Sequence, residues 1–79
     1  MIKLTELRVY PKYYIQNIKN CLNLTEEENK IFDLTIKGYP TNFIADEIGI
    51  STRTLFRRLN LINQKLLLLD YDKIIKGEY

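Results

Sequence analysis

The three residues Gly49-Ile50-Ser51 constrain the fold most, because they interrupt an otherwise helical pattern. Before them, Ile44 and Ile48 are spaced as on one helix face. Glycine tolerates the positive φ of a tight turn, and serine is a strong N-cap. The stretch therefore predicts a short helix that stops at Gly49 and a second helix that begins near Thr52.

An apolar stripe defines this second helix. Its residues recur at steps of four and three positions, which keeps them on one face: Leu55, Leu59, Ile62, Leu66 and Leu69. At 1.5 Å per residue, a helix over 52–69 would be about 27 Å long. Leu61, Leu67 and Leu68 fall off the stripe, so we expect them either under the N-terminal helix and tail or in an intermolecular contact.

Two earlier helices are indicated by their ends. Thr25 and Glu28 have the spacing of a capping box, and a glycine and a proline follow Lys37, which predicts a helix over 26–37. Pro11 suits the first position of another helix, over about 11–22. Its inner face is expected to hold Tyr14, Ile15, Ile18 and Leu22, with Asn23 as a left-handed stop.

The short helix before Gly49 is expected to begin at a Thr41 cap. It is expected to bury Phe43, Ile44 and Ile48. Four helices with short connections predict one all-α domain. We divide it into an N-terminal arm and helix (1–23), a helix-turn-helix module (24–69) and a short C-terminal tail (70–79). The arm at 1–10 is expected to be extended or a short helix.

Composition argues against several functions. The chain has no histidine and a single cysteine, Cys21, so it can form neither a zinc-ligand cluster nor an internal disulfide. The acidic residues 26–28 are explained by helix capping, and we expect neither an enzyme nor a cofactor. No apolar run approaches about 20 residues. We therefore expect no membrane association and a cytoplasmic protein, in a bacterial cell or a phage-infected host.

Charge is unevenly distributed although the net charge is only +2. Residues 24–47 carry two basic and six acidic side chains, whereas residues 48–69 carry four basic and none acidic. A charged run is more often only a solvated face. Here it follows a turn motif, and the segregation favours a polyanionic partner.

The basic residues have a definite place on the predicted helix. Arg53, Arg57, Asn60 and Gln64 cluster opposite the leucine stripe, because successive residues advance by about 100°. Guanidinium and carboxamide groups can read base edges in the major groove. We expect base contacts from Arg53, Thr54 and Arg57, and phosphate contacts from Thr41, Ser51, Thr52 and Arg58. Phe56 would pack against the preceding helix or touch a thymine methyl.

Residues 24–66, LTEEENKIFDLTIKGYPTNFIADEIGISTRTLFRRLNLINQKL, resemble the DNA-binding domain of LuxR and GerE regulators, with region 4 of bacterial sigma factors as a relative. The resemblance implies a four-helix DNA-binding module of the stand-alone GerE type, often used as a dimer. After Lys65-Leu66 that family continues into a further helix that pairs with its twin. This chain has LLLLDYDKII over 66–75 instead, so that dimer contact is not carried over.

The expected partners are double-stranded DNA and a second copy of the chain. A homodimer contact would involve Leu61, Leu67, Leu68, Tyr13 and Tyr14. The main alternative is an adaptor that engages RNA polymerase or another transcription protein and keeps the helix-turn-helix as a scaffold. A further alternative is the DNA-binding subunit of a phage packaging or recombination complex.

Overall fold

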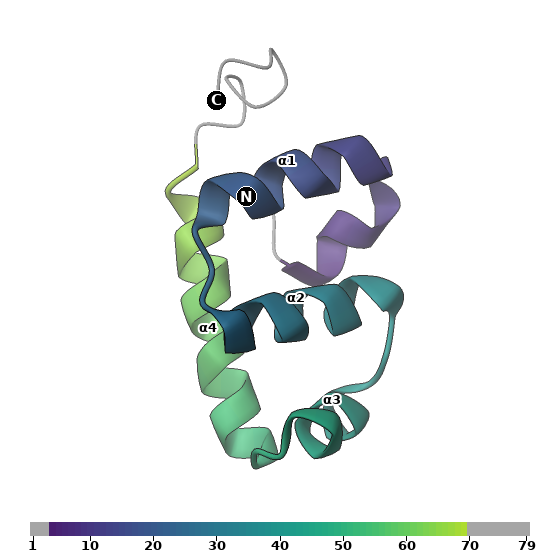
Figure 1. The fold of residues 1–79 in the computed structure, drawn as a ribbon, viewed down its shortest axis with the longest axis vertical. Coiled ribbons are helices and arrows are strands. Elements are labelled where there is room, and N and C mark those ends of the chain that lie inside the picture. Colours follow the sequence, from purple (N-terminus) through teal and green to yellow (C-terminus); the bar gives the residue numbers. More distant parts are fainter. Residues whose placement is uncertain (1–3, 70–79) are drawn as a thin grey trace.

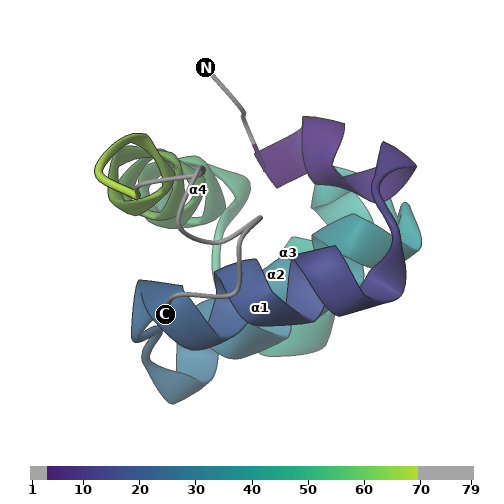
Figure 2. The ribbon, with the colours of Figure 1, turned by 90° about the horizontal axis from the view of Figure 1, so that it is seen from above.

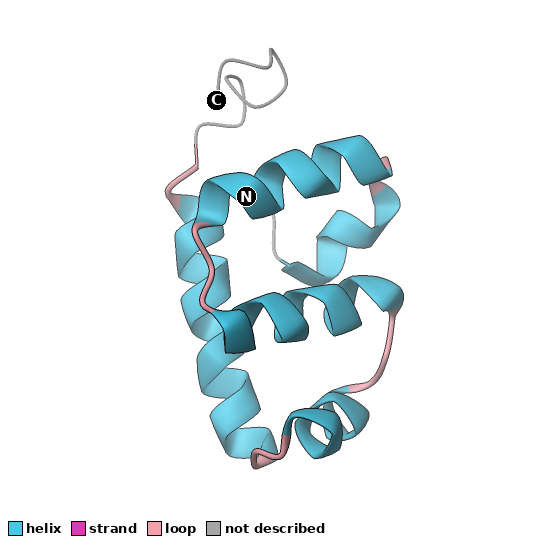
Figure 3. Cartoon of the chain, viewed as in Figure 1, coloured by secondary structure: helices cyan, strands magenta, loops and turns pink. Residues whose placement is uncertain are grey.

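The computed structural model describes residues 4–69, and this part of the chain contains five helices and no strand (Figures 1 and 3). The all-α prediction is therefore confirmed. The elements are the 3-10 helix η1 (Leu4–Val9) and the α-helices α1 (Lys12–Leu22), α2 (Glu26–Lys37), α3 (Thr41–Ile48) and α4 (Thr52–Leu67). The predicted tail at 70–79 lies outside the described residues.

α4 runs along one side of the molecule, and the other helices are arranged beside it from α1 at one end to α3 at the other (Figure 1). Seen from above, α1 and α2 lie on one side, while η1 and α4 lie on the other (Figure 2). The core between them takes side chains from every helix. Its fully buried large members are Leu4, Leu7, Ile18, Ile31, Phe32, Ile44, Leu55, Ile62 and Leu66.

The N-terminal arm is part of this core. Residues 4–9 form a short 3-10 helix, and the side chains of Leu4 and Leu7 are buried. The Leu4 backbone N–H also donates to Asn63 Oδ1 of α4 over 2.9 Å. A Cβ built on Gly38 would lie 2.7 Å from Arg8 Nη2, so the Arg8 side chain lies directly over the end of α2. The arm and the 24–69 segment thus share one core.

Most predicted helix ends are confirmed. Thr25 and Glu28 form a complete capping box at the start of α2. Gly38 and Gly49 end α2 and α3 with φ of 93° and 83°, values in the left-handed region that favours glycine. Asn23 ends α1 with φ 54°. Each stop therefore has the backbone conformation that its residue type predicted.

Four details differ from the sequence predictions. Pro11 and Pro40 are themselves the N-caps of α1 and α3, with extended ψ of 152° and 158°. α1 therefore begins at Lys12, one residue after its predicted start, and Thr41 is the first helical residue of α3 instead of its cap. Phe43 is 39 % exposed and stacks on Tyr39 at 4.6 Å between ring centroids, so it is not a core residue. α4 ends at Leu67, two residues before the predicted end.

Candidate nucleic-acid interface

The turn between α3 and α4 fixes how α4 begins. The N–H groups of Gly49 and Ile50 both donate to the Ala45 carbonyl, over 2.9 and 3.0 Å, which closes α3. Ser51 then adopts an extended conformation, and its Oγ accepts the Thr54 N–H over 3.1 Å. The half-buried Ile50 packs against the core. The chain therefore changes direction within three residues and starts α4 with a capped, exposed first turn.

One side of α4 faces away from the rest of the protein, and we call it the open face. Its members are all exposed: Arg53, Phe56, Arg57, Asn60 and Gln64. Arg53 and Arg57 form no ion pair with any residue in 4–69. Segment 48–69 contains no acidic residue. The open face thus presents two unneutralised guanidinium groups and two carboxamides, which are the side chains that can read base edges.

Phe56 is 52 % exposed, so about half of its surface is available to a partner. Thr54 is half-buried, and Ser51 Oγ donates to its hydroxyl over 3.0 Å. Ser51 and Thr52 are exposed at the start of α4, whereas Thr41 is half-buried at the start of α3. The predicted DNA contacts therefore fall on two helix N-termini and the open face. Arg58, the remaining residue of that prediction, lies in a different environment.

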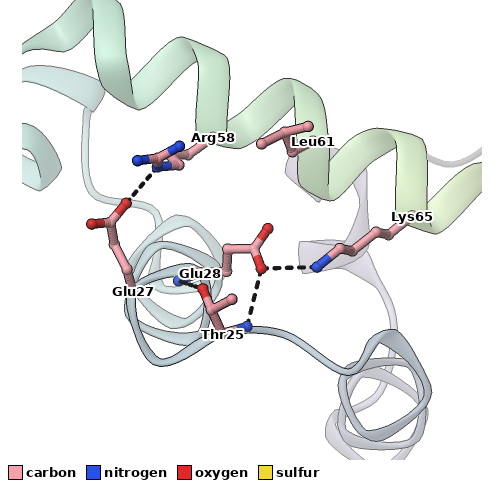
Figure 4. Close-up of a pocket in the computed structure, with 6 residues that line it drawn as sticks. All are labelled: Thr25, Glu27, Glu28, Arg58, Leu61 and Lys65. Atoms are coloured by element: carbon pink, nitrogen blue, oxygen red, sulfur yellow. Dashed lines mark hydrogen bonds and ion pairs between the residues drawn. The ribbon is translucent and has the colours of Figure 1, made fainter.

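The side of α4 that faces the start of α2 forms two ion pairs, and we call it the paired flank (Figure 4). Arg58 Nε donates to Glu27 Oε1 over 2.6 Å. Lys65 Nζ donates to Glu28 Oε1 over 2.8 Å, and the same carboxylate oxygen accepts the Thr25 N–H over 3.0 Å. Segment 48–69 holds no acidic residue that could compensate the Arg58 charge. The acid comes from α2, 31 residues away in the chain.

Glu28 is the most buried of these charged groups, with a side chain only 6 % exposed. Burial by itself raises the pKa of this carboxyl. The hydrogen bonds from Lys65 and Thr25, together with the Lys65 charge, outweigh that effect and hold the pKa of Glu28 below its ordinary value. The carboxylate is therefore ionised near neutral pH and joins α2 to α4.

The residues predicted for a dimer contact separate into two groups. Leu61 and Leu67 are exposed on the second half of α4, Leu68 is exposed at its C-cap, and Tyr13 is exposed on α1. Tyr14 is buried, with its ring 5.0 Å from that of Tyr10. The structure thus accounts for Tyr14 within one chain, whereas the other four side chains are available to a partner.

Residues 4–69 offer neither a membrane-spanning helix nor a cluster of metal ligands. No helix in this part of the chain is long and apolar enough to cross a membrane. No three side chains of the metal-ligating types gather in it either. Comparisons of the chain with protein-family models, with curated proteins and with solved structures found no match.

Proposed function

We propose that this protein is a transcriptional regulator of the LuxR/GerE helix-turn-helix type that binds double-stranded DNA sequence-specifically, with α4 in the major groove. The observation that carries the proposal is the open face. It follows a tight turn, holds Arg53 and Arg57 without acidic partners, and adds two carboxamides at helical spacing. A second helix that enters the major groove by its N-terminal half is how helix-turn-helix proteins read sequence.

The proposed contacts follow from position along α4. Arg53 and Arg57 lie on the open face of the first two turns and would read base edges, together with Thr54. Ser51 and Thr52 lie at the positive end of the α4 dipole and would bind phosphate. Thr41, in the first turn of α3, would hold a second phosphate. Phe56 is exposed beside the two arginines and can touch a thymine methyl.

A homodimer is part of the proposal, because one module makes few phosphate contacts and two modules would double them. Leu61, Leu67 and Leu68 are exposed, and they are the side chains that we assign to the contact with the second copy.

The test is fluorescence anisotropy with a labelled duplex of mixed sequence at several salt concentrations, alongside light scattering. We expect a dimer for which the logarithm of the DNA affinity falls linearly with the logarithm of the salt concentration. Arg53→Ala and Arg57→Ala should each weaken binding, whereas Lys12→Ala on the distant helix α1 should not. A strict monomer that ignores DNA at low salt would overturn the proposal.

The exposed leucines also favour a second candidate, an adaptor that uses α4 to contact RNA polymerase or another transcription protein. Salt dependence separates the two functions. Binding through several phosphates weakens steeply with salt, whereas an apolar contact through Leu61, Leu67 and Leu68 does not.

A further inference from the structure

Arg58 differs from the other two arginines of α4 in how its guanidinium is held. Its Nε donates to Glu27 Oε1 over 2.6 Å, and within residues 4–69 its two Nη atoms make no hydrogen bond. In Figure 4 a dashed line joins the Glu27 carboxylate to one nitrogen of the Arg58 guanidinium, and no line leaves the other two nitrogens. The Nε of the guanidinium is therefore bound within the protein, whereas its two Nη groups still have N–H donors available to a partner.

The place of Arg58 on α4 suits a phosphate contact. It follows Arg57 directly, so it lies about 100° around the helix from it. When a helix lies in the major groove, its central face meets base edges and its flanks meet the sugar-phosphate strands. The Arg58 side chain is 42 % exposed, so it remains accessible while bound to Glu27.

We propose that Glu27 is a positioning residue for DNA binding, which holds the Arg58 guanidinium through Nε and leaves its Nη pair directed to one phosphate of the duplex. The inference rests on the proposed DNA-binding function. An arginine whose planar fork is already oriented loses less conformational freedom on binding than one that is free to rotate. Support of a contact residue by a second hydrogen-bonded side chain is a general feature of binding sites.

Charge alone would predict the opposite effect of Glu27 on DNA binding. A carboxylate near the interface repels phosphate, so removing Glu27 should strengthen binding if only long-range electrostatics mattered. The hydrogen bond and the charge must therefore be separated. Glu27→Gln removes the charge and keeps an oxygen that accepts from Nε, whereas Glu27→Met removes the charge and the acceptor together.

The experiment measures the affinity of both variants for the labelled mixed-sequence duplex, because a phosphate contact does not depend on base sequence. We expect Glu27→Met to bind about threefold more weakly than Glu27→Gln, and this difference to vanish when Arg58 is also replaced by alanine. Arg58→Ala alone should lower the slope of log affinity against log salt by about one. The exposed neighbour Glu26 is the matched control, where Gln and Met should bind alike.

The outcomes distinguish this inference from the function on which it rests. If the wild-type chain binds DNA but the two Glu27 variants bind equally, Glu27 does not position Arg58, and the proposed function stands. If Met binds more tightly than Gln, the ion pair competes with phosphate, and the inference is also wrong. If the wild-type chain binds no DNA, both this inference and the proposed function are wrong. Melting temperatures of all variants identify any loss of affinity that comes from unfolding.

Discussion

The two cation-bearing sides of α4 have different neighbours, although they belong to one helix. On the open face, Arg53 and Arg57 point away from the protein and have no acidic partner in residues 4–69. On the paired flank, Arg58 and Lys65 each bind a glutamate of α2. About 100° of rotation separates Arg57 from Arg58. That rotation decides whether an arginine has no acidic neighbour in residues 4–69 or is held by one within the fold.

The difference shows that the first turn of α2 does two things. Its glutamates suit the positive end of the α2 dipole, as a helix start would require. Glu27 and Glu28 also reach across to α4 and confine the negative charge to one side of it. The open face itself holds two arginines and no acidic side chain. Charge segregation along the sequence therefore becomes charge segregation around one helix.

The largest effect is expected on the paired flank. Glu28→Ala removes the carboxylate that caps α2 and binds Lys65, and it leaves the Thr25 N–H without its acceptor. Removing one partner of such a network leaves the other groups unsatisfied. We expect the free energy of unfolding to fall by about 2 kcal/mol, because Lys65 is partly exposed and water can replace some of the interaction. Urea denaturation measures it.

Glu26→Ala is the matched control for that change, since it alters a glutamate of the same helical turn that is exposed. We expect this substitution to lower the free energy of unfolding by less than about 0.5 kcal/mol, as for other surface substitutions. Equal losses at the two positions would show that helix–dipole effects, and not the contact with α4, account for the role of Glu28.

The next effect concerns the open face. Arg57→Ala should leave the melting temperature unchanged, because the side chain is exposed and forms no ion pair within residues 4–69. If Arg57 reads a base, affinity for the operator should fall about tenfold, equivalent to about 1.4 kcal/mol. Anisotropy with a selected operator duplex measures this loss. Unaltered affinity would remove Arg57 from the proposed site.

Acid should weaken the contact between Glu28 and Lys65. The pKa of Glu28 is lower in the folded chain than its ordinary value of 4.5, so its ionised form stabilises the fold above that pH. This contribution is lost as pH falls through the folded pKa. We expect the stability difference between wild type and Glu28→Gln to be constant above pH 4.5 and to shrink below it. A difference that stays constant into acid would show that folding does not shift this pKa.

Local signals in the sequence were enough to predict most of the fold. Helix ends depend on residues next to one another, so Thr25 with Glu28 and the glycines at 38 and 49 could be identified directly. Periodicity identified the buried side of α4, including Leu55, Ile62 and Leu66. These features need no knowledge of how the helices pack.

Contacts between distant segments could not be predicted in this way. The acid that binds Arg58 lies in another helix, where the sequence pattern predicted only helix capping for residues 26–28. Asn63 accepts from the Leu4 N–H, a contact that no local pattern indicates. The resemblance to LuxR and GerE regulators stays a prediction. The open-face residues were placed correctly because helical geometry alone determines their direction.

The smallest expected effect compares the two ion pairs of the paired flank with each other. Arg58 and Glu27 are 42 % and 37 % exposed at their side chains, and an ion pair this open contributes about 0.5 kcal/mol or less to folding. Lys65 binds a carboxylate that is only 6 % exposed, so Lys65→Ala should cost more, about 1 kcal/mol. Urea denaturation at low and high salt measures both, and salt should diminish only the Arg58 effect. If Arg58→Ala destabilised the fold as much as Lys65→Ala, the Glu27 contact would be a structural one, and its ion pair would be needed to hold α2 against α4.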